Sequence, residues 1–175
     1  MLNIEEFLSF LENHKKDRGI MADLKRGLSE TTECRAWPHI LRFCEPRNEK
    51  ERRIVQLIAA GFAIHLRSGN SGNMGDAIRK IAGGGGKGEK GLETFDGRFR
   101  RIISASTSDE LCDLLPGIMR AAERKGIPID FAQLYKDLHF WGERSKLDWA
   151  SSYWRTEKQE EGGVGDDETS DTDNG

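Results

Sequence analysis

The sequence predicts an all-α protein, a compact bundle of about eight or nine helices. Apolar residues recur at intervals of three and four, the alternation typical of strands is rare, and β-branched residues are sparse. The 175 residues are enough to bury one core, and the 36% hydrophobic content is typical of a globular protein with a polar surface.

The first half of the chain contains four predicted helical segments. Asn3 has the sequence context of a capping box, so the first helix is expected to begin there and to be interrupted at Gly19. The other segments of this half are 20–28, 32–44 and 48–66. The last has the strongest pattern, because Asn48 can cap it and seven residues share one face. These are Ile54, Leu57, Ile58, Gly61, Phe62, His65 and Leu66.

A glycine-rich stretch separates this half from the rest of the chain. A brief helix is expected at 76–82, and glycines then dominate the sequence. Because glycine disfavours regular structure, we expect a loop over 83–94. This loop would join an N-terminal lobe, about residues 1–82, to a C-terminal lobe, about residues 95–155.

Two helices are predicted directly after this loop. The first carries an apolar stripe at helical spacing, formed by Phe95, Phe99, Ile102 and Ile103. The second begins at Ser108, contains Pro116 as a source of a kink, and is expected to end at Gly126.

Two more helices complete the predicted domain. Asp130 can cap the first, which buries Phe131, Leu134, Tyr135, Leu138 and Trp141. The final helix is expected to begin at Ser145 and to present Leu147, Ala150 and Trp154 to the core. We expect Trp141, Trp149 and Trp154 in core or interface contacts, with base stacking as the alternative. Trp149 lies off the stripe and is the best candidate for a protein interface.

The net charge of −3 is unevenly distributed along the chain. Residues 156–175 contain eight acidic residues and one Lys, a charge of −7, so residues 1–155 carry +4. The acidic segment also lacks the apolar surface that would offset the entropy of ordering. We therefore predict a helical domain over 1–155 and an acidic disordered tail over 156–175.

Several function classes find no support in the sequence. Acidic residues occupy the region where a secretory signal would be basic, and the longest apolar run, 57–64, is too short to span a bilayer. The cysteines and histidines show no metal-ligand spacing, and no catalytic motif is present. We expect a soluble cytoplasmic protein with no membrane partner, catalytic residue, metal or cofactor. A metal-dependent nuclease is the enzymatic alternative.

Arginines flank the apolar stripe of the helix that follows the glycine-rich loop. On a helical wheel Arg98 and Arg101 lie together along one edge of the stripe, while Arg100 points away. Two guanidinium groups one turn apart can each donate two hydrogen bonds to a phosphate. An ordinary solvated face, with arginines paired to acids, is the alternative that the charges leave open.

The order of the segments resembles a known family. They are DLKRGLS (23–29), RAWPHILRF (35–43), FDGRFRRIISASTSDELCDLL (95–115) and IPIDFAQLYKDLHFWGERSKLDWASSYW (127–154). The chain is similar to the CasB family, the small subunit of Cascade, which is the type I-E CRISPR surveillance complex. The resemblance extends over most of residues 20–154, and the glycine-rich loop and acidic tail depart from the family pattern.

The resemblance implies an all-helical, non-catalytic subunit of a ribonucleoprotein. Its partners would be a guide CRISPR RNA, the target and displaced DNA strands, the other Cascade subunits and a second copy of the chain. By this resemblance the phosphate-binding residues are Lys25, Arg26, Arg98 and Arg101. Further candidates, placed by charge and helix position, are Arg52, Arg53, Arg120, Arg124 and Arg144. The alternative function is a helical adaptor that binds only protein.

Overall fold

The fold is seen in a computed structural model that describes residues 2–66, 68–69, 72–83 and 88–155. Within these ranges the chain forms nine α-helices, two 3₁₀ helices and no β-strand beyond one isolated bridge between Ser68 and Ile129. The predicted all-α class is therefore confirmed. Expectations that fall on 84–87 and on the acidic tail, 156–175, lie outside the described residues.

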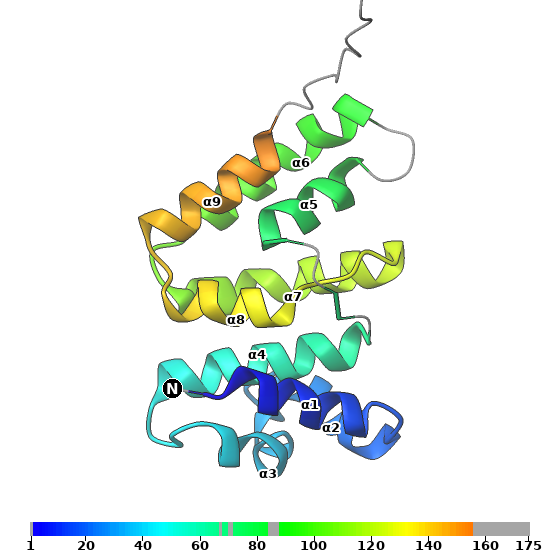
Figure 1. The fold of residues 1–175 in the computed structure, drawn as a ribbon, viewed down its shortest axis with the longest axis vertical. Helices are drawn as coiled ribbons and strands as arrows, with labels where there is room; N and C mark the ends of the chain where they lie inside the picture. Colours follow the sequence, from blue (N-terminus) through cyan, green and yellow to red (C-terminus); the bar gives the residue numbers. More distant parts are fainter. Residues whose placement is uncertain (1, 67, 70–71, 84–87, 156–175) are drawn as a thin grey trace, which may run out of the picture.

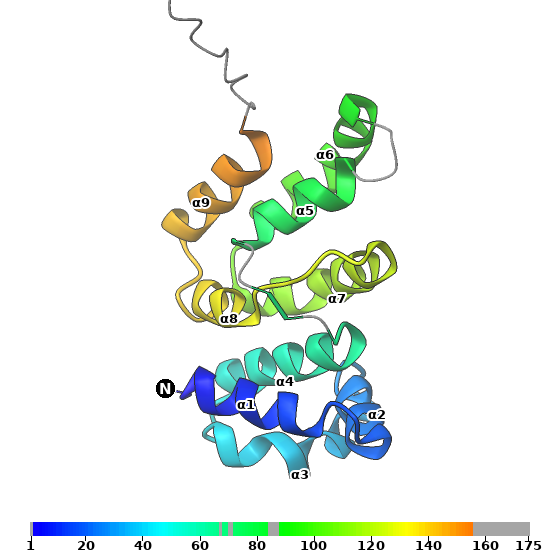
Figure 2. The same cartoon turned by 45° about the vertical axis from the view of Figure 1, so that its right-hand side comes forward.

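The helices stack in three tiers. Their bounds are α1 (Ile4–His14), α2 (Arg18–Arg26), η1 (Glu33–Arg35), α3 (Trp37–Ile40), η2 (Leu41–Phe43), α4 (Glu49–Ile64), α5 (Met74–Gly83), α6 (Gly88–Ile103), α7 (Ser108–Lys125), α8 (Phe131–His139) and α9 (Glu143–Trp154). Figures 1 and 2 show α1 to α4 at one end, which we call the N-terminal or first tier. Helices α7 and α8 form the middle tier, and α5, α6 and α9 form the last tier at the other end.

Capping side chains fix where several helices begin. The side-chain oxygens of Asn3, Asn48 and Asp130 accept backbone N–H groups three residues further on, as their sequence contexts predict. Gly126 ends α7 in the left-handed conformation, with φ of 66°. The helix interruption predicted at Gly19 was wrong, because Asp17 caps α2 and places Gly19 in its first turn.

Helix α4 lies between the other helices of the N-terminal tier and the middle tier. Every residue from 54 to 63 is buried, so the helix is enclosed on all sides and not on one face alone. It contacts α2 on one side and α7 and α8 on the other. Leu66, expected on the core face, lies beyond the helix end and is 46% exposed.

Helix α9 presents a different face to the core from the predicted one. Ser145, Trp149 and Tyr153, spaced four apart, are buried, whereas Leu147 is 62% and Trp154 is 41% exposed. The Trp149 indole is fully enclosed, and its Nε1 donates to Asp137 Oδ2 at 2.7 Å. The interface role expected for Trp149 was therefore wrong. The buried face carries two aromatic side chains, Trp149 and Tyr153, whereas the predicted stripe carries only Trp154, so this face removes more aromatic surface from water.

The tiers divide the chain at a different point from the predicted lobes. Helix α5 contacts α9 and α6, so residues 74–83 belong with the C-terminal helices. Helix α6 begins at Gly88, and its first turns occupy part of the loop expected over 83–94. The chain passes from the N-terminal tier to the other helices between α4 and α5.

Gly75 allows α5 and α9 to approach closely. A Cβ atom at this position would lie 2.1 Å from the backbone oxygen of Trp149. That oxygen belongs to the helix backbone, so it cannot move aside as a flexible side chain can.

Gly75→Ala should lower the free energy of unfolding by about 1–3 kcal/mol, because the added methyl group overpacks the α5–α9 contact. Gly83→Ala is the matched control, since a Cβ there meets no atom of the described residues within 4 Å. Urea unfolding followed by tryptophan fluorescence measures both variants. Equal stability of the two variants would contradict the close approach.

Asp137→Asn tests the buried carboxyl beneath Trp149. Burial raises the pKa of Asp137, although hydrogen bonds from Trp149 and Gln133 oppose this effect. The folded protein therefore binds a proton at a higher pH than the unfolded chain, and this group adds stability as the pH falls. Between pH 7 and 4 the wild type should gain stability relative to the variant. Parallel pH profiles from urea unfolding would contradict this.

Candidate nucleic-acid interface

Two of the three exposed arginines of α6, Arg98 and Arg101, extend from a rigid support. Phe99 and Ile102 are buried, and the Phe99 ring stacks on Tyr153 of α9 with centroids 3.9 Å apart. Arg98 and Arg101 are exposed, and no ion pair involves either within the described residues. The buried stripe thus fixes the backbone that carries these two guanidinium groups, neither of which forms an ion pair within the described residues.

Arg98 lies over a gap in the surface of α7. A Cβ atom at Gly117 would lie 2.7 Å from Arg98 Nη2, so the guanidinium rests where this helix has no side chain. Its carbon also lies 5.3 Å from the centre of the Phe95 ring. Arg98 therefore joins the exposed edge of α6 to the neighbouring face of α7.

Two further arginines continue this face along α7. Arg120 and Arg124 are exposed and lie three and seven residues beyond Gly117, which keeps them on its side of the helix. Their Cα atoms are separated by about 6 Å along the helix axis. We call Arg98, Arg101, Arg120 and Arg124 the α6–α7 arginine group.

Arg100 has a different role from its two neighbours. Its Nε donates to Asp96 Oδ2 at 2.6 Å, and its guanidinium lies 5.0 Å from the Trp154 ring. Trp154 Nε1 donates to the other oxygen of Asp96 at 2.6 Å. These two hydrogen bonds lower the pKa of Asp96. Arg100 thus fastens α6 to the end of α9.

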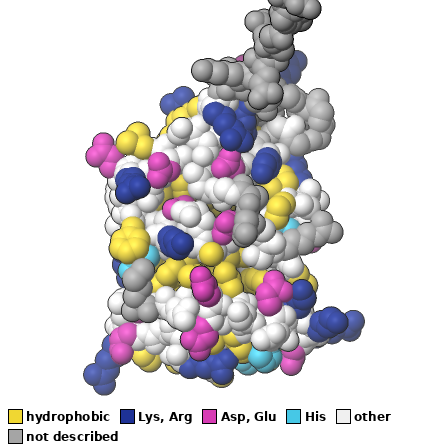
Figure 3. Space-filling view, viewed as in Figure 1, with side chains coloured by type: hydrophobic (Ala, Val, Ile, Leu, Met, Phe, Trp, Pro, Cys, Tyr) yellow, Lys and Arg dark blue, Asp and Glu magenta, His cyan; other side chains and the backbone are white. Residues whose placement is uncertain are grey.

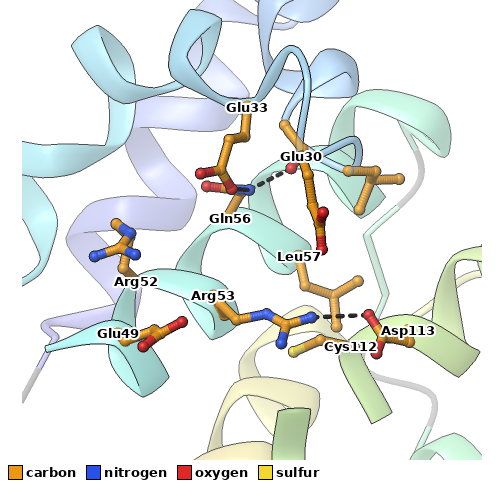
Figure 4. A pocket seen from close by; sticks show the side chains of 11 residues that line it. Glu30, Glu33, Glu49, Arg52, Arg53, Gln56, Leu57, Cys112 and Asp113 are labelled. Atoms are coloured by element: carbon orange, nitrogen blue, oxygen red, sulfur yellow. Dashed lines mark hydrogen bonds and ion pairs between the residues drawn. The ribbon is translucent and has the colours of Figure 1, made fainter. Parts of the chain in front are cut away.

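Arg52 and Arg53 line a pocket dominated by acids. The pocket has a volume of about 450 Å³ and lies between α4, α7 and the segment after α2 (Figure 4). Arg53 pairs with Asp113 at 2.8 Å and lies 3.6 Å from Asp109, and Arg52 donates to the Pro46 carbonyl at 2.7 Å. The acidic residues that line the pocket are Glu30, Glu33, Glu49 and Asp113. A phosphate would meet net negative charge here.

The remaining candidates lie apart from the α6–α7 arginine group. Lys25 and Arg26 are exposed on α2, in the N-terminal tier, and Arg26 lies 3.4 Å from Asp23. Arg144 is exposed in the first turn of α9. The predicted residues therefore lie on two neighbouring helices, α6 and α7, and at separate positions on other helices. Sequence spacing did not reveal Gly117, whose only signal is a glycine after a proline within a predicted helix.

Lys and Arg side chains lie near both ends of the face drawn in Figure 3, including the end formed by α5, α6 and α9. Lys80 is exposed on α5. Its neighbour Arg79 donates to the Tyr153 carbonyl at 2.9 Å and so holds α5 against α9. Figure 3 also shows acidic side chains among them, so this face carries both positive and negative charge.

The described residues offer little to a catalytic mechanism. Burial raises the pKa of the Cys112 thiol to about 12, which keeps it from forming a nucleophilic thiolate. His65 is buried, and its Nε2 pairs with the Ile127 carbonyl. Within the described ranges no cluster of three metal-ligating side chains occurs. In the same part of the chain, every helix is too short or too polar to cross a membrane.

Comparisons with known proteins agree with this architecture. The crystal structure of CasB from Thermus thermophilus has a similar fold, with a TM-score of 0.68 and 23% sequence identity. The similarity covers 88% of this chain and 99% of that one. No curated protein sequence matches the chain. A family model, CRISPR-associated protein Cse2, matches residues 20–154. The chain belongs to the CRISPR-associated Cse2 family.

Proposed function

We propose that this chain is a non-catalytic Cascade subunit that binds phosphate backbones without reading base sequence. Membership of the Cse2 family implies a CRISPR Cascade subunit. The observation that carries the finer proposal is the pair Arg98 and Arg101, exposed along one edge of the buried stripe of α6. In this proposal the pair contacts phosphates, and Arg120 and Arg124 extend the contact along α7.

The chemistry of the α6–α7 arginine group suits a polyanion. A guanidinium stays charged at any physiological pH, and its planar fork can donate two hydrogen bonds to one phosphate. Contacts of this kind set position and affinity but carry no sequence information. Sequence choice would come from base pairing between guide RNA and target DNA.

Binding by the isolated chain should be weak. Residues 1–155 carry a charge of only +4, which is modest beside domains that bind DNA unaided. In an assembled complex the other subunits would hold nucleic acid close, so a few phosphate contacts act at high effective concentration. The surface would then stabilise the guide RNA–target DNA hybrid and the displaced strand. A second copy of the chain would extend the same track.

A protein-only adaptor is the second candidate function. The observation that favours it is a pair of exposed apolar side chains, Phe140 at 64% and Leu147 at 62% exposure, near the α8–α9 connection. Apolar side chains of this size commonly mark protein contacts. The two functions differ in whether Arg98 and Arg101 contact nucleic acid, and the following titration separates them.

Arg98→Ala/Arg101→Ala should weaken DNA binding roughly tenfold or more at 50 mM salt, because two phosphate contacts are lost. The slope of log K against log salt should fall by about 1.8 for duplex DNA, or about 1.4 for a single strand. Fluorescence anisotropy with labelled DNA measures both values.

Arg35→Ala/Arg47→Ala is the matched control, since it removes two exposed arginines from the N-terminal tier. It gives the same change in net charge and should have a much smaller effect on affinity. DNA binding that is absent, or that is insensitive to salt and unchanged by Arg98→Ala/Arg101→Ala, would favour the adaptor.

Gly117→Glu tests the position of Arg98 without removing an arginine. A carboxylate introduced at this point should pair with the Arg98 guanidinium and reduce the salt slope by about 0.9 for duplex DNA. Gly117→Ala is the control, because its methyl group displaces only the flexible end of Arg98. The same anisotropy series measures both variants. Full affinity in the glutamate variant would show that Arg98 takes no part in binding.

A further inference from the structure

The described chain ends at Arg155, in the tier formed by α5, α6 and α9. Trp154, near the end of α9, contacts the Phe99 ring edge-on with centroids 5.2 Å apart. Arg155 pairs with Asp76 of α5 at 3.1 Å. The last described residue is therefore held at the tier that carries Arg98, Arg101 and Lys80.

Charge complementarity links the two parts of the chain. Residues 156–175 carry −7, and the rest carries +4. Within the described residues Arg98, Arg101 and Lys80 show no carboxylate partner, whereas Arg100 and Arg155 each have one. The segment contains one aliphatic residue, Val164, and no aromatic residue, so its interactions must be mainly electrostatic.

The length of the segment is sufficient to reach these cations. Twenty residues can span at most about 70 Å, whereas the 16 residues of α6 extend over about 24 Å. Covalent attachment gives the acidic groups an effective concentration on the order of 1 mM at the surface. A contact with an intrinsic dissociation constant on the order of 0.1 mM would then be mostly formed.

We propose that residues 156–175 bind the exposed cations of the α5 and α6 tier, Arg98, Arg101 and Lys80, and compete with nucleic acid for them. The segment acts as an internal polyanion that suppresses non-specific binding by the free subunit. Binding of a nucleic acid in the assembled complex displaces it. The competition rests on the proposed function, whereas the contact between the segment and the surface does not.

The test uses the full-length chain in two forms. In the neutral form all eight acidic residues of 156–175 are replaced by Asn or Gln, which preserves length and shape. DNA affinity of this form should exceed that of the wild type by roughly tenfold at 50 mM salt, and the difference should vanish as salt is raised. Fluorescence anisotropy measures the affinities.

A second measurement detects the contact without DNA. A labelled peptide of residues 156–175 should bind the neutral form at low salt, and Arg98→Ala/Arg101→Ala in that form should weaken this binding. Arg35→Ala/Arg47→Ala in the same form is the control and should leave it nearly unchanged.

The outcomes separate this proposal from the proposed function. If the peptide fails to bind while DNA binds through Arg98 and Arg101, the internal competitor is wrong and the proposed function stands. Unchanged DNA affinity in the neutral form would likewise overturn the internal competitor alone. If the peptide binds but DNA does not, the contact is real and the proposed function fails.

Discussion

The candidate interface depends on the packing of α6 against α9. The stacked rings of Phe99 and Tyr153 bury one side of α6, and the Asp96, Arg100 and Trp154 cluster closes the edge of the same contact. Both use aromatic surface, which contributes apolar burial and a defined ring geometry together. An arginine on the opposite edge is then held toward solvent by the packing behind it. The exposure of Arg98 and Arg101 is thus a consequence of core formation.

Local sequence signals predicted much of the fold. Asn48, Asp130 and Gly126 act on backbone groups only a few residues away, so their effects can be read without knowledge of tertiary structure. The face of α9 could not be found in this way. Its orientation depends on Asp137, which lies on another helix and accepts the Trp149 indole N–H. The predicted stripe of Leu147, Ala150 and Trp154 was a weaker determinant than this one buried pair.

In the candidate site, too, local features could be predicted from the sequence and tertiary contacts could not. Arg98 and Arg101 are three residues apart on one helix, so a helical wheel places them on a common edge. The environment of Arg53 is set by Asp113, which is 60 residues away in sequence. Charge alone therefore could not distinguish an arginine committed to an acid from one open to a phosphate. The contribution of Gly117 was equally hidden, because an absent side chain has meaning only beside the neighbour that fills its place.

The link between α4 and α5 has a mechanical consequence. His65 pairs with the Ile127 carbonyl, Gly69 donates to the Ile129 carbonyl at 3.2 Å, and Ser68 forms its bridge with Ile129. The chain is thereby tied to the α7–α8 connection at the point where it passes from the first tier toward the last. Rotation of the first tier against α7 and α8 would break these bonds. Any movement between these two tiers must therefore disrupt at least these three contacts.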